Sequence, residues 1–323
     1  MSESAPLNVV FLDSGTFPPK TVLRGLKVPH ALTRFDRTAP TEVAQRIASA
    51  DVVITNKVPV RREALAQASR LKLIAVAATG YDVIDVAACA ERNIAVCNVR
   101  NYARHTVPEH TFALILALRR SLMPYHRSVA AGRWEEHGQF CYFDYPIRDL
   151  AESTLGIFGA GAIGQSVARI ARAFGMNVLF ASRRDAAAKG IYTPFDDVLE
   201  RSDILTFHMP LKPETRNLIG VDEFARMKRK PLVINTARGG LIDEQALVGA
   251  LVSGQISGAG FDVATEEPMP ERHPLQAILD RHDFILTPHI AWASEEATQT
   301  VADRVFDNID SFFAGSPTNL ISC

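Results

Sequence analysis

Residues 155–164 read Leu155-Gly156-Ile157-Phe158-Gly159-Ala160-Gly161-Ala162-Ile163-Gly164. An apolar run over 154–158 leads into the glycines, and an apolar pattern with helical spacing over 163–174 follows them. The order strand, Gly-x-Gly-x-x-Gly, helix is the context in which this spacing indicates a dinucleotide site. Gly159 allows the turn, Gly161 lets the backbone approach a pyrophosphate, and Gly164 lets the helix pack closely on the strand.

The phosphates of such a ligand would lie on free N–H groups at the helix N-terminus, where the helix dipole favours anions. We therefore expect the ligand to contact Gly159, Gly161, Ala162, Ile163 and Gly164. Since the glycine spacing by itself is often fortuitous, a structural turn with no ligand is the alternative.

The totals indicate a globular protein of two domains. The chain has 323 residues, of which 47% are hydrophobic and 22% charged, and domains of 100–200 residues are usual. A formal net charge of -1 gives no general attraction to nucleic acid or to an anionic membrane. No apolar run reaches the roughly 18 residues that a membrane span needs.

The four cysteines, Cys89, Cys97, Cys141 and Cys323, lack the spacing of a metal site or a redox pair. We interpret them as reduced thiols of a cytoplasmic protein, and no metal site is expected. The N-terminus shows no basic segment followed by an apolar one, so no signal peptide is evident.

Short apolar runs alternate with helical patterns on both sides of the glycine loop. Before it, strands are predicted at 8–12, 31–35, 51–55, 73–77 and 94–97, and helices at 41–50, 62–68 and 84–92. After it, strands are predicted at 177–181, 203–206, 232–235, 258–261 and 284–286, and helices at 195–201, 221–227 and 244–253. Such alternation is typical of parallel sheets covered on both faces. The fold class is therefore α/β, with two doubly wound parallel-sheet domains.

Three further segments complete the organisation. One long helix is predicted over 107–131 with Thr106 as its N-cap, and a final helix over 294–314 is expected to cross back to the first domain. The segment 134–146 is rich in aromatic residues and is predicted to be irregular. It is either a loop folded onto its own domain or an arm that packs on a second subunit. We favour the arm, because aromatic side chains are enriched in interface cores.

Three polar side chains, Arg238, Glu267 and His289, follow predicted strands of the second domain. Ligands bind outside the carboxyl ends of parallel strands, so these side chains should reach the same edge as the dinucleotide. A carboxylate beside a histidine holds the ring's tautomer and suits it to acid–base chemistry. A guanidinium fork matches a carboxylate.

Each of these residues also has a structural interpretation. Arg238 could form a surface ion pair, Glu267 could be a turn residue held by Pro268, and His289 could be a core histidine. Of the other histidines, we expect His208 to line the cofactor pocket. His273 and His282 flank loops and are predicted to be solvated.

Seven segments together identify a family resemblance. They are Thr79-Gly80-Tyr81-Asp82, the glycine loop 159–164, His208-Met209-Pro210-Leu211 with Thr215, Asn235-Thr236-Ala237-Arg238-Gly239-Gly240, Gly258-Ala259-Gly260-Phe261-Asp262-Val263, Glu267-Pro268 and Pro288-His289. In this order they resemble the D-isomer-specific 2-hydroxyacid dehydrogenases over most of the chain. Segments 56–59, 139–144 and 288–294 resemble the glycerate dehydrogenase (hydroxypyruvate reductase) branch of that family.

The resemblance implies a reaction between NAD(P)H and a small 2-oxo acid, hydroxypyruvate or glyoxylate, giving D-glycerate or glycolate. His289 would be the proton donor, Glu267 its partner, and Arg238 the ligand of the substrate carboxylate. The substrate would also contact Trp292 and the N–H groups of Ala78, Thr79 and Gly80. The remaining cofactor contacts implied are Val107, Ser182, Arg183, Arg184, His208, Pro210, Thr215, Thr236, Ala237, Arg238, Asp262 and His289.

The resemblance also implies a flavodoxin-like substrate domain over 1–102 plus 291–323 and a Rossmann coenzyme domain over 103–290. The family is usually a homodimer through the coenzyme domain. About 20 residues beyond the glycine loop, an NAD enzyme presents an acid to the adenosine ribose. Here Ser182-Arg183-Arg184 stands at that place, and no carboxylate appears before Asp185. We therefore expect NADP to be preferred, the alternative being NAD binding without the acid while both arginines are solvated.

Two competing functions remain. One is the oxidation of another small anion such as phosphite, which Lys57 and Arg238 could both face. The other is a nucleotide-sensing binding protein, since corepressors resemble this family. The chain shows no basic or disordered extension that would recruit partners for such a role.

Overall fold

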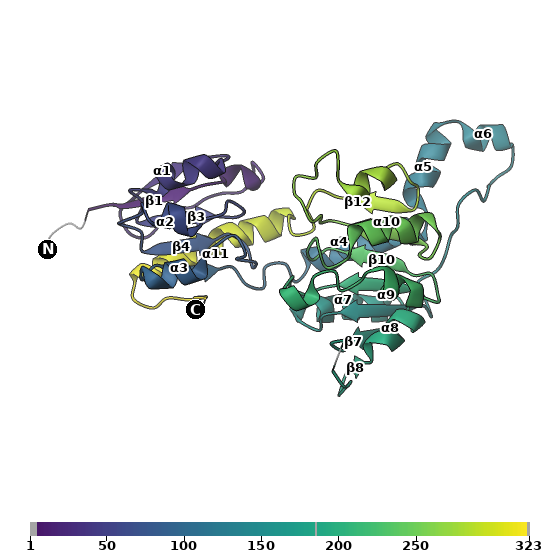
Figure 1. The fold of residues 1–323 in the computed structure, drawn as a ribbon. Coiled ribbons are helices and arrows are strands. Elements are labelled where there is room, and N and C mark those ends of the chain that lie inside the picture. Colours follow the sequence, from purple (N-terminus) through teal and green to yellow (C-terminus); the bar gives the residue numbers. More distant parts are fainter. Residues whose placement is uncertain (1–4, 185, 322–323) are drawn as a thin grey trace. The chain divides into compact units, whose positions relative to one another are not determined.

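The computed structural model describes residues 5–184 and 186–321, so Asp185 lies outside the described residues. The chain divides into two compact units (Figure 1). Unit one comprises the chain up to Tyr102 and from Ala293 onward, and unit two comprises Ala103–Trp292. The second boundary therefore lies two residues beyond the expected position between 290 and 291.

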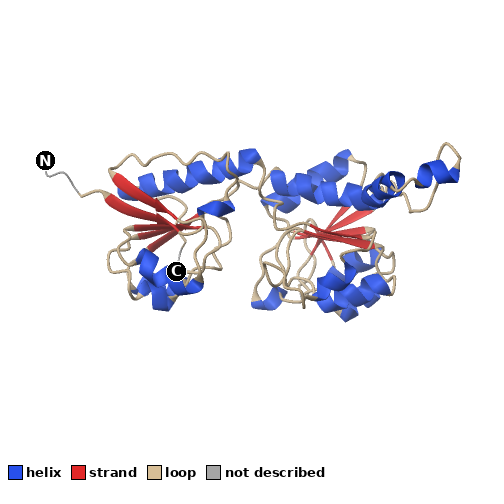
Figure 2. Cartoon of the chain, turned by 90° about the horizontal axis from the view of Figure 1, so that it is seen from above, coloured by secondary structure: helices blue, strands red, loops and turns tan. Residues whose placement is uncertain are grey.

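Unit one contains a parallel sheet in the order β2-β1-β3-β4-β5. The strands are β1 Leu7–Phe11, β2 His30–Arg34, β3 Val52–Thr55, β4 Leu73–Val76 and β5 Ala95–Asn98. This is the flavodoxin-like strand order. Every residue of β3 and β4 is buried, because helices cover both faces of the sheet (Figure 2).

The helices of unit one come from both ends of the chain. They are α1 Val43–Ile47, α2 Arg62–Leu65, α3 Val86–Glu91 and α11 Glu295–Phe313, with 3-10 turns η1 Ser14–Thr16 and η2 Pro40–Glu42. Ser294 caps α11 by accepting a hydrogen bond from the N–H of Ala297 at 3.1 Å. Since α11 packs on β4, the expected return of the final helix to the first unit is confirmed.

Unit two contains a seven-stranded parallel sheet in the order β12-β11-β10-β9-β6-β7-β8. The strands are β6 Thr154–Phe158, β7 Asn177–Ala181, β8 Tyr192–Thr193, β9 Ile204–Phe207, β10 Leu232–Asn235, β11 Gly258–Phe261 and β12 Phe284–Leu286. The chain reverses its direction of travel between β6 and β9, as in the Rossmann fold. The expected fold class, two parallel-sheet α/β domains, is confirmed.

The helices of unit two are α4 Thr106–Arg119, α5 Leu122–Ala130, α6 Arg133–His137, α7 Ala162–Ala173, α8 Phe195–Arg201, α9 Val221–Arg226 and α10 Glu244–Val252. Two 3-10 helices, η3 Pro213–Thr215 and η4 Pro274–Ile278, lie in loops. No helix among the described residues is long and apolar enough to cross a membrane.

The prediction of one long helix over 107–131 is wrong. The helix breaks after Arg119, where Ser121 has a left-handed backbone with φ of 49° and its Oγ donates to the carbonyl of Pro146 at 2.6 Å. Thr106 is also not the N-cap. It is the first helical residue, and its Oγ1 donates to the carbonyl of Ala291 at 3.0 Å. Within the segment predicted to be irregular, residues up to His137 form α6.

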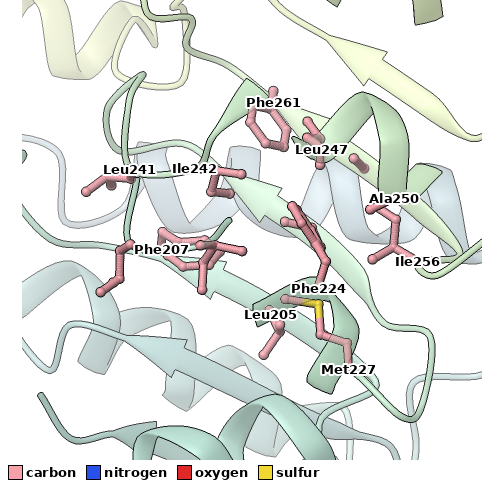
Figure 3. Packing of buried hydrophobic residues seen from close by; sticks show 14 of the residues in the cluster. Leu205, Phe207, Phe224, Met227, Leu241, Ile242, Leu247, Ala250, Ile256 and Phe261 are labelled. Carbon is pink, nitrogen blue, oxygen red and sulfur yellow. The ribbon is translucent and has the colours of Figure 1, made fainter. Parts of the chain in front are cut away.

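The core of unit two fixes the strand ends that carry the polar residues. Figure 3 shows side chains of β9, β11, α9 and α10 pointing toward one another, among them Phe207, Phe224, Leu247 and Phe261. The ring of Phe207 stacks on that of Phe158 from β6 at 4.7 Å between centroids. Because these rings are fully buried, β6, β9 and β11 form a rigid base for the loops that follow them.

Candidate functional site

The glycine loop fits a dinucleotide. A Cβ on Gly159, whose φ is 108°, would lie 2.3 Å from the carbonyl oxygen of His208. A Cβ on Gly164 would lie 2.0 Å from the carbonyl oxygen of Gly159, so both glycines are required by packing. A Cβ on Gly161 would meet no atom within 4 Å. The second glycine therefore faces open space at the start of α7, where a pyrophosphate would approach Ala162 and Ile163.

This loop lies where the strand order reverses. The N–H of His208, just after β9, donates to the carbonyl of Phe158 at the end of β6 at 2.8 Å. The Nε2 of His208 lies 3.0 Å from the Oγ1 of Thr206, and burial lowers the pKa of His208 to about 3. The ring is therefore neutral at neutral pH. Downstream, the Oγ1 of Thr215 donates to the carbonyl of Pro210 at 3.0 Å and closes the loop beside it.

Glu267 and His289 meet. The Nδ1 of His289 lies 2.6 Å from the Oε2 of Glu267, although the two residues are 22 positions apart in the chain. The other oxygen, Oε1, accepts the N–H of Ala264 at 2.9 Å. The His289 side chain retains 23% of its exposure, so a ligand can reach the ring.

The loop around His289 is held by the buried carboxylate of Asp262. Its Oδ1 accepts from the Oγ1 of Thr287 at 2.5 Å and from the N–H of Ile290 at 2.9 Å, and its Oδ2 accepts from the N–H of Ala291 at 2.8 Å. His289 has a φ of 55°, which is unfavourable for a residue with a side chain. The bonds on each side of His289 hold it in this conformation.

Arg238 lies in the turn after β10. Its Nη1 donates to the carbonyl of Ala237 at 2.7 Å, and its own carbonyl accepts from the Nδ2 of Asn235 at 2.9 Å. The hydroxyl of Thr236 lies 3.0 Å from that of Thr111, a residue of α4.

Thr111 connects this turn to α4, because its hydroxyl lies 3.0 Å from that of Thr236. The Oγ1 of Thr111 donates to the carbonyl of Val107 at 2.8 Å. The turn that carries Arg238 is thus connected through Thr111 to the first turn of α4, where Val107 lies.

In unit one, the predicted carboxylate ligands follow β4. The carbonyl of Ala78 accepts from the N–H of Val99 at 3.0 Å, and that of Thr79 accepts from the Nδ2 of Asn98 at 2.7 Å. Among the described residues, the N–H groups of Ala78, Thr79 and Gly80 have no hydrogen-bond acceptor. Trp292, which is the last residue of unit two, is half-buried.

The two arginines after β7 differ. The Nη1 of Arg184 lies 2.9 Å from the buried Oε1 of Glu223, its Nη2 donates to the carbonyl of Leu218 at 2.5 Å, and its guanidinium lies over the ring of Phe195. Arg183 is exposed. The Oγ of Ser182 donates to the carbonyl of Arg183 at 3.1 Å. Arg184 is therefore bound within unit two, whereas Arg183 faces solvent.

The prediction that His273 is solvated is wrong, whereas His282 is exposed as predicted. His273 is buried before the 3-10 helix η4, where its Nδ1 accepts from the N–H of Leu275 at 3.3 Å. Its Nε2 lies 2.9 Å from the Oε2 of Glu244, without the alignment of a hydrogen bond. Sequence reasoning missed Glu244, for which the only signal was the pair Asp243-Glu244 at the start of a helical pattern.

Within residues 5–184 and 186–321, no three His, Cys, Asp or Glu side chains are grouped to hold a metal ion.

Comparison with known proteins agrees with this geometry. Residues 112–291 match the family model described as D-isomer specific 2-hydroxyacid dehydrogenase, NAD binding domain. The glycerate dehydrogenase of Methylorubrum extorquens is 47% identical over 97% of this chain and 98% of its own length.

Solved structures resemble the whole chain. The TT0316 protein from Thermus thermophilus has a TM-score of 0.86 at 30% identity, covering 98% of this chain and 100% of that one. An NADPH-dependent glyoxylate/hydroxypyruvate reductase from Sinorhizobium meliloti, in complex with NADP and malonate, has a TM-score of 0.83 at 26% identity, covering 98% and 97%.

The hold of Asp262 on the His289 loop is open to a direct test. The carboxylate of Asp262 accepts from three donors, and Asp262→Asn replaces one of its acceptor oxygens by an amide that is itself a donor. At least one donor then loses its acceptor, so the variant should lower the free energy of unfolding by about 2 kcal/mol. The amides of Ile290 and Ala291 should also exchange faster with deuterium. As a control, Asp283→Asn breaks a pair with Arg281 just before β12 and should change stability by less than about 1 kcal/mol. Equal effects of the two variants would contradict the prediction.

Proposed function

Because the chain belongs to the D-isomer specific 2-hydroxyacid dehydrogenase family, we propose that it reduces hydroxypyruvate and glyoxylate with NADPH. Membership makes the chain an NAD(P)-dependent oxidoreductase. The observation that carries the proposal is the 2.6 Å approach of Glu267 to His289. This acid–base pair follows two adjacent strands of the sheet whose switch point carries the dinucleotide fingerprint. The choice of substrate follows the names of the relatives.

The proposed roles follow from which ring nitrogen of His289 faces Glu267. When bound, the reduced nicotinamide supplies the hydride. Because Nδ1 of His289 faces Glu267, Nε2 is the ring nitrogen that donates a proton to the 2-oxo oxygen. Glu267 holds the ring in that tautomer and stabilises the imidazolium. Asp262 fixes the loop and, in the proposal, lies on the nicotinamide side.

The proposed substrate ligands are of three chemical kinds. Arg238 presents a guanidinium fork to the carboxylate. The N–H groups of Ala78, Thr79 and Gly80 in unit one are proposed as an anion nest, which is supported by their having no acceptor among the described residues. Trp292 is the proposed apolar contact.

The proposal is tested by a panel of 2-oxo acids, assayed with NADPH and NADH, on the wild type and on His289→Ala. We expect turnover of hydroxypyruvate and glyoxylate, and a kcat lowered roughly 10²- to 10⁴-fold in His289→Ala, the usual contribution of a proton donor. The dissociation constant of the nucleotide should not change. The control His282→Ala removes an exposed histidine. Oxidation of phosphite without turnover of any 2-oxo acid would favour the other anion, and tight nucleotide binding with no turnover would favour a sensing role.

We propose that NADP is preferred over NAD and that Arg183 is the residue that recognises its 2′-phosphate. Ser182 and Arg183 follow β7 where an NAD enzyme carries an acid, and a 2′-phosphate matches a hydroxyl and a guanidinium. Arg184 supports this arrangement indirectly, since Glu223 and Phe195 hold its side chain. The NADP in the Sinorhizobium meliloti structure is consistent with the family's capacity for this cofactor.

Arg183→Ala should lower kcat/KM for NADPH roughly 10- to 100-fold and leave kcat/KM for NADH nearly unchanged. The reason is that a charged hydrogen bond contributes about 1.5–3 kcal/mol and each 1.4 kcal/mol is about tenfold. Steady-state kinetics with both nucleotides measures it. Arg201→Ala, at the exposed end of α8, serves as the control. A wild type that prefers NADH would refute the NADP proposal.

We also propose a homodimer built on an arm formed by residues 120–149. Figure 1 shows α5 and α6 extending away from the sheet of their own unit. Phe140 and Phe143 are 88% and 81% exposed. The arm is nevertheless braced internally, since Tyr142 donates to the Oγ of Ser128 at 2.9 Å and Arg133 pairs with Asp144 at 2.9 Å. A rigid arm with exposed aromatic rings suits an interface.

Light scattering on the wild type should give the mass of a dimer, whereas the double variant Phe140→Ser and Phe143→Ser should give the monomer. Removing two large rings from an interface core costs several kcal/mol of association, at about 2 kcal/mol or more for each central residue. The control Val221→Ser changes an exposed apolar residue of α9. A wild-type monomer would disprove the proposal.

A cytoplasmic location is likewise proposed, and the free thiols of Cys89 and Cys97 support it.

A further inference from the structure

The backbone around the peptide that joins Ala264 to Thr265 contacts three different parts of the site. It lies in the loop after β11, between Asp262 and Glu267. The carbonyl of Ala264 lies against Gly239 in the turn after β10, and the N–H groups of Thr265 and Ala264 donate to Glu244 of α10 and to Glu267 of the same loop. This peptide is therefore the point at which displacements of the separate loops would be transmitted to one another.

The first contact is with Gly239. A Cβ on Gly239 would lie 2.0 Å from the oxygen and 2.1 Å from the carbon of the Ala264 carbonyl, and 2.4 Å from the nitrogen of Thr265. The backbone of Gly239 is not left-handed, so its conformation does not require glycine. What requires it is the closeness of the peptide. Because Gly239 follows Arg238 directly, the peptide and the arginine turn cannot shift independently.

The second contact is with Glu244, in the first turn of α10. Its side chain is 7% exposed, and its Oε1 accepts the N–H of Thr265 at 2.7 Å. Burying a carboxylate is costly unless hydrogen bonds compensate. Its Oε2 lies 2.9 Å from the Nε2 of the buried His273. The Nδ1 of His273 accepts from Leu275, so the neutral ring carries its proton on Nε2.

The third contact is made by the peptide just before, because the N–H of Ala264 donates to the Oε1 of Glu267 at 2.9 Å, while the Oε2 of Glu267 faces His289 at 2.6 Å. We propose that Glu244 and Gly239 are positioning residues that clamp the Ala264–Thr265 peptide and thereby align Glu267 with His289 and with the turn of Arg238. This inference rests on the proposed roles of Glu267 and His289. In this proposal neither Glu244 nor Gly239 touches the substrate.

The clamp has a consequence for the kinetics. Glu244→Gln replaces one acceptor oxygen by a donor amide. Whichever way the amide turns, a donor then faces either the N–H of Thr265 or the Nε2–H of His273. The peptide moves, and Glu267 moves with it. A misplacement of about 1 Å lowers turnover by up to roughly a hundredfold, so kcat should fall roughly 10- to 100-fold. The dissociation constant of NADPH should not change, because the glycine loop that would hold the nucleotide follows a different strand, β6.

The test is a double-mutant cycle on the full-length protein, with kcat for hydroxypyruvate and NADPH measured in the wild type, Glu244→Gln, Glu267→Gln and the double variant. If Glu244 acts through Glu267, the double variant is no slower than Glu267→Gln alone. Asp243→Asn is the matched control, since asparagine caps a helix as well as aspartate does. Gly239→Ala should lower kcat as Glu244→Gln does, with Gly249→Ala, whose Cβ meets nothing within 4 Å, as its control.

Independent effects of Glu244→Gln and Glu267→Gln that multiply in the double variant would overturn the clamp. A normal kcat in Glu244→Gln, or a loss confined to NADPH affinity, would overturn it as well. Normal turnover of Glu267→Gln alone would instead remove the proposed role of Glu267, and the clamp with it. The single and double variants therefore separate failure of the inference from failure of the proposed function.

Discussion

The register of three neighbouring strands determines where Arg238, Glu267 and His289 lie. Asn235 of β10 pairs with Phe261 of β11, and Phe261 pairs with Leu286 of β12. Because the strands are parallel and in register, the chain leaves the sheet at three adjacent places along one edge. Arg238, Asp262 with Glu267, and His289 follow these exits. A slip of one residue would turn every side chain of a strand to the other face, so the buried core that fixes the register also fixes the site.

The parts of these loops that carry Arg238, Glu267 and His289 lie outside helices and strands, and buried carboxylates hold them. Asp262 accepts two backbone N–H groups and a hydroxyl, and Glu244 accepts the N–H of Thr265. In unit one, Asp13 accepts the N–H groups of Asn56, Lys57 and Val58, and burial nevertheless raises its pKa. Main-chain donors therefore balance much of this buried negative charge.

Much of the fold could be predicted from the sequence, because apolar runs of four or five residues between helical patterns are a strong signal for buried parallel strands. β8 was missed because two residues, Tyr192 and Thr193, are too few to show a pattern. The break at Ser121 was missed because the apolar pattern continues across it, and only its left-handed backbone reveals it. The strand-edge rule and the family resemblance together predicted the meeting of Glu267 with His289.

What could not be predicted depends on contacts between side chains far apart in the chain. Nothing in Ser182-Arg183-Arg184 distinguishes its two arginines; Glu223, 39 positions beyond Arg184, binds only the second. His273 was predicted to be solvated because it flanks a loop, yet the 3-10 helix that begins at Pro274 buries its ring against Glu244. In both cases a buried acid on another element contacts the side chain, and the local composition of the loop does not show it. The backbone of these loops is held in the same way, since Asp262 and Glu244 accept N–H groups of residues more than 20 positions away along the chain.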